Sequence, residues 1–356
     1  MYLFSDGFDG EYSVSADLAK GGWYSLNSFA NITFSATSGR FGGGAVSMAN
    51  NVSGNSMFTP IPSNIAALAS TTANYAMWLY RAGRPGGNVF WLNMVGTSIM
   101  GSGNGTGFNS SGQLVGQNGP TLWSNTNICD GTWHWIEISY PGVGGFQQVL
   151  TWIDGSTAGR TGNTGVVSSA PGALSGAVMF PADATPIVID DFIVFNDDAD
   201  QTGDLTSSSM PLGGTNTQGR AGLRCSTSRP FAAGSNTAWT PDSGANYARV
   251  NEAVADDDTS YIEATASGTN DTYAFNLVLQ TVNNPLMCVV KARHMNPDAG
   301  TINMRGLAYN GTLGASTSRA AKAAYSVNGY PLFRDPNANT WTLARANACE
   351  FGVGIP

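Results

Sequence analysis

Alternation of apolar and polar positions marks the clearest elements of this chain. Residues 132–140 (TWHWIEISY) alternate so that one face carries Trp133, Trp135, Glu137 and Ser139, and the other carries His134, Ile136, Ile138 and Tyr140. A period of two residues is typical of a strand with two different faces. Further runs of strand length occur at residues 73–81, 89–95, 148–153 and 187–195. The Asp154–Gly155 pair predicts a hairpin turn after the third of these runs.

Glycine-rich segments separate these runs. Residues 39–48 predict a strand after a tight turn, and residues 100–119, rich in Gly, Asn and Ser, predict a thin hairpin or a mobile loop. In the second half, residues 273–279, 286–293, 301–307 and 340–344 again have strand patterns. Only two short helices are expected, over residues 316–324 and 345–351. No repeat of 20–50 residues indicates a solenoid or propeller.

Composition favours the same fold class. Charged residues make up 11% of the 356 residues, against about 25% in a typical globular domain. The chain has 45 glycines but only five glutamates and three lysines, so helix formers other than alanine are scarce. Apolar residues still reach 42%, which is enough for a core. We predict an all-β protein of two β-sandwich (jelly-roll-like) domains in tandem, joined by a short linker.

The domain boundary is predicted from a change in charge. Residues 196–214 are first acidic, then rich in Ser and Thr, and end in Pro and Gly. Up to residue 206 there are 5 basic and 14 acidic residues (net −9), and beyond it 11 basic and 10 acidic (net +1), which together give the −8 of the chain. We therefore predict a first domain over residues 1–205, a linker over 206–214 and a second domain over 215–356.

Charge and cysteine content limit the partners. A net charge of −8 argues against nucleic acid or an anionic membrane as a main partner, because both attract clustered cations. No apolar run is long enough for a membrane-spanning helix, and the first residues lack the features of a signal peptide. We expect a protein that is cytoplasmic or exported within an assembled particle. The four cysteines have no close pair and are expected to be free thiols.

Catalytic patterns are weak in this sequence. The two histidines, His134 and His294, have no nucleophile motif near them, so a serine hydrolase is not supported. A retaining glycosidase needs two carboxylates about 5–5.5 Å apart, and none of the five glutamates has an acid two residues further on. We predict no catalytic residues and no enzymatic activity.

Four aspartates are candidate calcium ligands. Asp6 and Asp9 near the start, and Asp190 and Asp191 near the end of the first domain, would approach each other if the terminal strands of that domain pair. The alternative interpretation is that these residues form solvated turns. Residues 256–258 are better explained as a turn or helix cap. No other cofactor is expected.

Aromatic residues offer a second kind of site. Most of the nine tryptophans lie in or beside predicted strands and are assigned to the core, although such rings could also stack on sugars. Phe108 and Trp123 fall in predicted loops. We select these two as the exposed aromatic side chains that would contact a ligand.

Several motifs resemble known families. Residues 130–136 (DGTWHWI), 152–155 (WIDG) and 189–194 (IDDFIV), with 4–10 and 39–48, resemble in this order the laminin-G/concanavalin-A-like lectin sandwich over residues 1–200. Residues 224–230, 233–235, 239–247, 250–252, 256–261 and 341–353 are similar to a β-sandwich module of tailed-bacteriophage structural proteins, over residues 215–356. Members of the lectin-like superfamily bind sugars, proteins or no known ligand, and no catalytic residue is implied.

The resemblance implies a non-enzymatic component of a bacteriophage virion, a tail or head appendage or a capsid decoration. It would assemble with other virion proteins and with itself, as a homo-oligomer that we expect to be a trimer. A surface poor in charge is consistent with such covered interfaces. The second domain is expected to dock and the first to face outward. The alternative is a carbohydrate-binding adhesin that recognises a glycan of the host surface.

Overall fold

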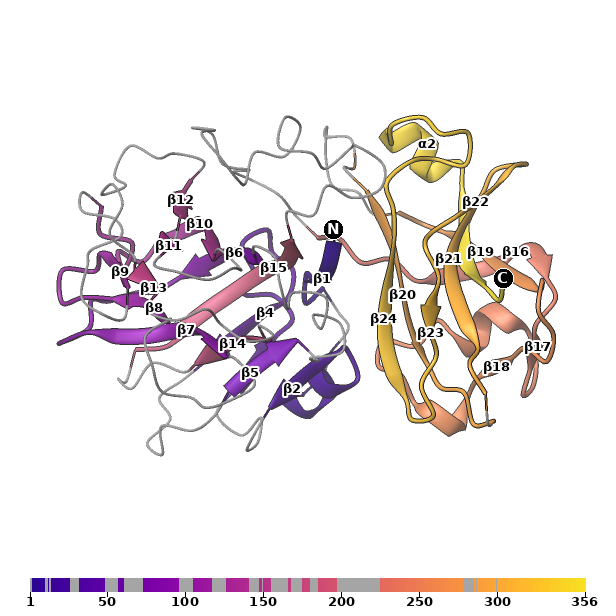
Figure 1. Ribbon diagram of the computed structural model, residues 1–356, viewed down its shortest axis with the longest axis horizontal. Helices are drawn as coiled ribbons and strands as arrows, with labels where there is room; N and C mark the ends of the chain where they lie inside the picture. Colours follow the sequence, from indigo (N-terminus) through magenta and orange to yellow (C-terminus); the bar gives the residue numbers. More distant parts are fainter. Residues whose placement is uncertain are drawn as a thin grey trace. The chain divides into compact units, whose positions relative to one another are not determined.

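The computed structural model describes residues 2–9, 12, 14–25, 32–48, 57–60, 73–95, 105–116, 126–140, 147–148, 150–154, 166–167, 175–179, 185–196, 225–277, 285, 287–298 and 300–356. These residues form short antiparallel strands with very little helix, which confirms the all-β class (Figure 1). The chain divides into two compact units, Met1–Ala19 with Trp23–Cys225, and Lys20–Gly22 with Ser226–Pro356. The predicted linker at 206–214 lies outside the described residues.

Seven strands form the first sheet of unit 1, in the order β12–β10–β6–β15–β4–β3, with β1 paired to β15. Their bounds are β1 (Tyr2–Asp6), β3 (Ile32–Ser35), β4 (Ala45–Met48), β6 (Ala73–Tyr80), β10 (Trp133–Tyr140), β12 (Leu150–Ile153) and β15 (Ile187–Asn196). The terminal strands pair, which is the condition that the calcium hypothesis sets: Asp6 on β1 lies opposite Phe192 on β15.

Six strands form the second sheet of unit 1, in the order β2–β5–β14–β7–β8–β9. They are β2 (Trp23–Ser25), β5 (Met57–Pro60), β7 (Val89–Val95), β8 (Gly105–Phe108), β9 (Leu114–Gly116) and β14 (Ser175–Met179). A small pair, β11 (Gln147–Gln148) with β13 (Val166–Val167), and the 3₁₀ turn η1 (Ser15–Ala19) complete the unit. Strands β8 and β9 confirm the predicted hairpin within residues 100–119.

The main core of unit 1 lies between these two sheets. The first sheet contributes aliphatic side chains such as Leu79, Ile136 and Ile138, and the second contributes Trp23 and Phe108, all at most 1% exposed. Side chains alternate along a strand, so the neighbouring positions of β6 and β10 point away from this core. Unit 1 is therefore a two-layer sandwich whose seven-stranded sheet has a separate outer face.

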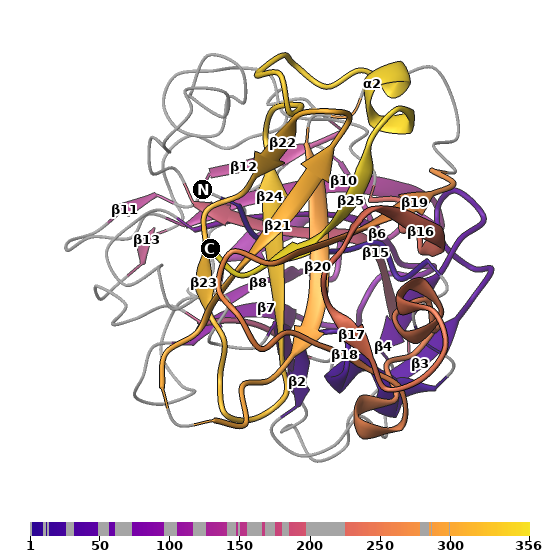
Figure 2. The same cartoon turned by 90° about the vertical axis from the view of Figure 1, so that its right-hand side faces the viewer.

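Unit 2 has a sheet of its own, in the order β16–β19–β25–β21–β22 with β23 paired to β21, and an antiparallel pair β20–β24 (Figure 2). The strands are β16 (Pro230–Thr237), β19 (Asn270–Phe275), β20 (Cys288–His294), β21 (Asn303–Tyr309), β22 (Leu313–Ala315), β23 (Arg319–Ala320), β24 (Ser326–Leu332) and β25 (Glu350–Gly354). Smaller elements are β17 (Thr240–Pro241), β18 (Ile262–Glu263), η3 (Asn246–Arg249), η4 (Asp257–Thr259) and α2 (Leu343–Asn347).

Gly306 shows how closely the two layers of unit 2 pack. A Cβ atom at this position would lie 2.5 Å from Cβ of Tyr330 on β24 and 3.1 Å from Cβ of Val290 on β20. Only glycine allows β21 to approach the pair β20–β24 at this distance. The sandwich predicted for the second half is therefore present, with its core between these strands.

The two helix predictions have different outcomes. The helix expected over residues 316–324 is wrong, because these residues include strand β23, which pairs with β21. The helix expected over 345–351 is present in a shifted form as α2, capped by the side chain of Thr342, and β25 begins at Glu350. Within the described stretches no helix is both long and apolar enough to cross a membrane.

Candidate functional site

The outer face of the seven-stranded sheet carries a second cluster of large side chains. We define the outer aromatic face by the aromatic residues of this cluster and the rings that pack against them: Phe41, Trp78, Tyr80, Trp133, Trp135 and Trp152. The residues come from β6, β10, β12 and the loop before β4. Four tryptophans lie on this one side of the sheet, whereas the inner face combines aliphatic side chains with the phenyl and phenol rings of Phe4, Tyr75 and Phe192.

Strand register places these rings in adjacent rows. Trp135 on β10 lies opposite Trp78 on β6, and Trp133 lies opposite Tyr80. The ring centroids of Trp78 and Trp135 are 5.5 Å apart, and those of Tyr80 and Trp133 are 5.6 Å apart. Both separations are in the favourable range for aromatic pairs. Trp135 is fully buried, whereas Tyr80 and Trp133 are each half-buried at the edge of the cluster.

One carboxylate lies among these rings. Glu137 is fully buried on β10, opposite Trp152 of β12 and Ala76 of β6. Its Oε1 accepts a hydrogen bond of 2.7 Å from the indole Nε1 of Trp135. This hydrogen bond to a carboxylate fixes the orientation of the Trp135 ring, which lies in the row of the sheet next to the pair Tyr80–Trp133. Glu137 therefore has a structural partner of its own.

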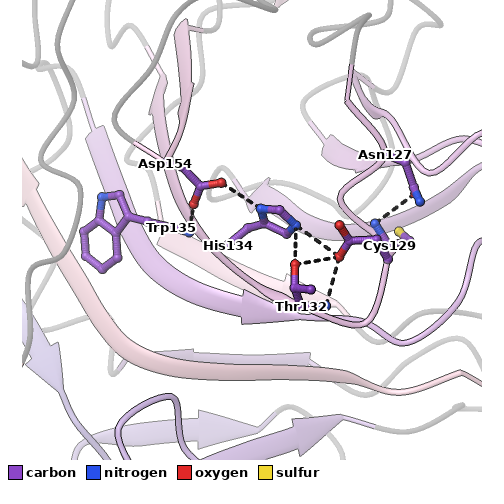
Figure 3. Close-up of polar contacts among 7 residues, drawn as sticks. Asn127, Cys129, Thr132, His134, Trp135 and Asp154 are labelled. Carbon is purple, nitrogen blue, oxygen red and sulfur yellow. Dashed lines mark hydrogen bonds and ion pairs between the residues drawn. The ribbon is translucent and has the colours of Figure 1, made fainter.

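A cluster of polar side chains surrounds His134 at the start of β10 (Figure 3). Nδ1 of His134 lies 2.8 Å from Oδ2 of Asp154, and Nε2 lies 3.2 Å from Oδ1 of Asp130. Asp154 also accepts a hydrogen bond of 2.8 Å from the backbone N–H of Trp135. It follows the last residue of β12 and has a φ of 51°, as residues in tight turns do. The histidine thus connects the loop before β10 to the turn after β12.

The electrostatics of this cluster favour a charged imidazole. Burial alone would lower the pKa of His134, but the hydrogen bonds and charges of Asp154 and Asp130 outweigh it and raise that pKa above 6.5. Burial would raise the pKa of Asp130, but hydrogen bonds from Thr132 and His134 lower it instead. Protonated His134 can donate to both carboxylates at once.

The same geometry bears on catalysis. Oγ1 of Thr132 lies 3.1 Å from Nε2 of His134, which is within reach for a nucleophile and its base. However, Asp130 Oδ1 accepts hydrogen bonds from both the hydroxyl and the backbone N–H of Thr132, at 2.8 and 2.9 Å, and also faces Nε2. A ring nitrogen that faces a carboxylate holds its proton and is a poor general base. The arrangement fits a structural clamp better than a catalytic triad.

The four calcium candidates are held by protein donors. Asp6 is buried and accepts hydrogen bonds from the indole of Trp23 at 2.6 Å, the backbone of Phe8 at 2.9 Å and the hydroxyl of Tyr12. Asp9 accepts a hydrogen bond from the N–H of Gly44, Asp190 accepts from those of Arg40 and Asp191, and Asp191 accepts from that of Cys225. In the described part of the chain no three acidic, histidine or cysteine side chains form a metal-binding group. Calcium binding stays a prediction.

The surface aromatics selected from the sequence have separate outcomes. The prediction for Phe108 is wrong: it is fully buried in β8, opposite Val89 of β7, and the guanidinium of Arg81 lies 5.8 Å from its ring centroid. Phe108 ends a strand whose inward positions close the core, so it cannot contact a ligand. Trp123 lies outside the described residues.

Sequence reasoning placed Trp78, Trp133 and Trp135 in the core, and Trp78 and Trp135 are indeed buried, but it missed that they form a cluster separate from the main core. The signal was present in the alternation of residues 132–140, which puts Trp133, Trp135 and Glu137 opposite the isoleucines. Only the packing shows that the isoleucines face the second sheet and the tryptophans do not.

Comparisons with known proteins give fold similarity alone. No family model matches the chain, and no curated protein matches it either. Among solved structures, a carbohydrate esterase from the Shiga toxin-encoding bacteriophage phi24B is 18% identical, with 55% of this chain and 97% of that chain covered and a TM-score of 0.34. The CBM22-1 xylan-binding domain of Paenibacillus barcinonensis Xyn10C is 9% identical, with 55% and 94% covered and a TM-score of 0.28.

A Trypanosoma rangeli sialidase is also similar, at 12% identity and a TM-score of 0.31, with 49% of this chain and 30% of the sialidase covered. At TM-scores below 0.5, these likenesses say nothing about an activity or ligand of this chain. The expected lack of enzymatic activity therefore stays a prediction.

Proposed function

We propose that this chain is a glycan-binding adhesion protein, and that unit 1 binds the sugar on the half-buried pair Tyr80–Trp133. The observation that carries the proposal is the outer aromatic face itself. The C–H faces of sugar rings pack on aromatic rings. A half-buried ring pair at the edge of a buried cluster offers such a surface with no rearrangement of the fold.

Rigidity supports the same proposal. Trp133 packs against Tyr80 with the two ring planes tilted by 46°, and Tyr80 lies two residues from Trp78 on the same strand. Trp78 in turn packs on Trp135, whose indole is held by Glu137. A surface that is ordered before binding loses little conformational entropy when the ligand arrives. Tyr80 and Trp133 belong to β6 and β10, each of which has a partner strand on both sides, so the two rings are attached to the sheet.

The polar groups near this surface favour binding without turnover. Glu137 is engaged with Trp135, and both ring nitrogens of His134 face carboxylates. A glycosidase needs two carboxyl groups facing one scissile bond, and a hydrolase needs a base with a free lone pair. We therefore retain a non-enzymatic role.

The biological setting that we propose is a bacteriophage particle. It rests on the sequence resemblance of residues 215–356 to a module of phage structural proteins and on the low charge of the chain. In this setting the second unit docks to other virion proteins, the chain self-associates, and the first unit presents its outer aromatic face to a glycan of the host surface. Peptides of this chain in purified particles would support this setting, and their absence would overturn it.

Glycan arrays test the binding proposal. The full chain is expected to bind a limited set of oligosaccharides, and the substitution Trp133→Ala should weaken that binding at least tenfold. Phe231→Ala is the matched control, because Phe231 is an aromatic residue of unit 2 with 54% of its surface exposed. Equal binding by wild type and Trp133→Ala, with both proteins folded, would overturn the proposal, as would an array on which no glycan binds.

A further inference from the structure

An exposed cation lies at the outer aromatic face. The guanidinium carbon of Arg40 is 5.0 Å from the ring centroid of Trp78 and 5.1 Å from that of Phe41. Arginine over the faces of aromatic rings is a favourable cation–π arrangement, and it restricts a side chain that is otherwise mobile. Arg40 is exposed, so its charge faces solvent while its planar group is positioned by the two rings.

The backbone of Arg40 is fixed as well. Its N–H donates to Oδ2 of Asp190 at 2.8 Å, and the turn that contains it is closed by a bond of 2.9 Å from the N–H of Gly39 to the carbonyl of Gly43. Asp190 lies on β15 directly opposite Trp78 of β6. The loop is therefore attached to the same row of the sheet as the ring that its side chain covers.

The guanidinium of Arg40 has no carboxylate partner in the described part of the chain. Three arginines of unit 2 do have one: Arg249 pairs with Asp242 at 3.3 Å, Arg345 with Asp335 at 3.4 Å, and Arg293 with Asp257. Buried Arg81 donates instead to backbone carbonyls, at 2.9 Å. An arginine that is oriented by aromatic rings and not used by an acid keeps its fork of N–H donors for a ligand.

The position of this cation matches the sugar surface. Tyr80 follows Trp78 by two residues on β6, so the two side chains lie on one face about 6.5–7 Å apart. Arg40 covers the Trp78 row, and the half-buried pair Tyr80–Trp133 forms the adjacent row. A sugar ring on that pair would place a substituent within reach of the guanidinium.

We propose that the glycan bound at this face is acidic, and that Arg40 pairs with the carboxylate of a uronic or sialic acid residue. This inference rests on the proposed function. A planar carboxylate accepts two parallel N–H bonds from the arginine fork, which a neutral hydroxymethyl group cannot do. The net charge of −9 in the first 206 residues opposes polyanions in general, but at 0.15 M salt such repulsion is screened beyond about 8 Å. One local cation therefore selects a carboxylate at one position.

Matched ligands and variants test this inference by calorimetric titration of the full chain. The probes are oligogalacturonate, its methyl-esterified neutral form, a sialylated oligosaccharide and its asialo form. We expect one acidic probe to bind at least tenfold more tightly than its neutral counterpart, which also identifies the kind of acid. Arg40→Gln should abolish this preference and leave the affinity for the neutral form unchanged, and Arg40→Lys should retain part of it. Arg84→Gln, at an exposed arginine of the same unit, is the control.

The outcomes separate this inference from the proposed function. If Trp133→Ala abolishes binding but Arg40→Gln keeps the full preference for the acid, the role of Arg40 is wrong and glycan binding stands. Equal affinity of the wild type for acidic and neutral forms would also overturn the role of Arg40. If Trp133→Ala binds every probe as the wild type does, the proposed surface itself is wrong.

Discussion

The two faces of the seven-stranded sheet in unit 1 are made by alternate residues of the same strands, yet their side chains differ. The inner face carries Leu79, Ile136 and Ile138, which pack against a second sheet. The outer face carries Trp78 and Trp135, with an indole held by a buried carboxylate and rings left half-exposed at the edge. The inner face stabilises the fold because its side chains fill the space between the two sheets. The outer face carries aromatic rings and a carboxylate that are held in fixed orientations. Half-exposed aromatic rings are not needed to fill a core, so we look for the ligand at the outer face.

The largest expected effect separates stability from binding. Leu79→Ala removes a fully buried side chain of the inner face and should lower the free energy of unfolding by about 2–5 kcal/mol, because it leaves a cavity. Trp133→Ala on the outer face should cost ~2 kcal/mol, since that ring is half-buried, but should remove glycan binding. Urea unfolding followed by circular dichroism measures both. Loss of binding by the folded Leu79→Ala protein, or full binding by Trp133→Ala, would contradict the division between the faces.

Unit 2 offers a sharper case, because a carboxylate occupies its inner face. Asp271 shares this face with Val353 and Gly306 by register and is fully buried. Burial raises its pKa to about 6, against the hydrogen bonds from Asn246 at 2.5 Å and Tyr273 at 3.1 Å, which lower it. In the described surroundings, Oδ1 of Asp271 has no hydrogen-bond partner.

The sign of the resulting pH dependence follows from the raised pKa. The folded state holds the proton of Asp271 more tightly than the unfolded chain, so this contribution to stability is full below about pH 4 and is lost as the pH rises through about 6. Asp271→Asn should therefore raise the free energy of unfolding at pH 7.5 by about 1–3 kcal/mol and flatten its dependence between pH 4 and 7. Glu263→Gln, at an exposed acid of the same unit, is the control. A profile for Asp271→Asn parallel to that of the wild type would show that the charge is not the cause.

The smallest effect on stability is expected from the protonation of His134, which lies at the start of β10 on the side of the inner face. Its pKa is raised because Asp154 and Asp130 outweigh the burial that would lower it, whereas burial lowers the pKa of His294 in unit 2. Titration of the two histidine ring signals by NMR should give pKa values on opposite sides of 6.5. The stability from His134 is full below pH 6.5 and is lost as the pH rises through its raised pKa.

The amount of stability involved is below about 1 kcal/mol, because the side chains of Asp154 and Asp130 are 49% and 36% exposed. Asp154→Asn removes the nearer carboxylate and should bring the pKa of His134 down, while the signal of His294 stays in place. If the two histidines of the wild type titrate at the same pH, the proposed pairing of His134 with Asp154 and Asp130 is contradicted.

Much of the fold could be predicted from local pattern. The alternation of residues 132–140 gives β10 and both of its faces, and the Asp154–Gly155 pair marks the turn after β12. These features depend on neighbours in sequence, so propensity and periodicity are sufficient.

The errors occur where distant residues decide. Residues 316–324 have alanines that favour a helix, but pairing of β23 with β21 overrides this propensity. Phe108 lies among Gly, Asn and Ser and looks exposed, yet it packs under the guanidinium of Arg81, a contact that no local pattern contains. Arg40 was not selected at all, because its position over Trp78 depends on the hydrogen bond from its backbone to Asp190, 150 residues away.

The most direct test of the central claim follows the indole N–H signals of the nine tryptophans by NMR during titration with a glycan that binds on the array. The signal of Trp133 should shift most, because its ring is half-buried beside Tyr80, and the signal of Trp23, which lies in the inner core, should stay unchanged. Saturable binding that leaves Trp133 unshifted while other signals move would contradict the assignment of the ligand to this face.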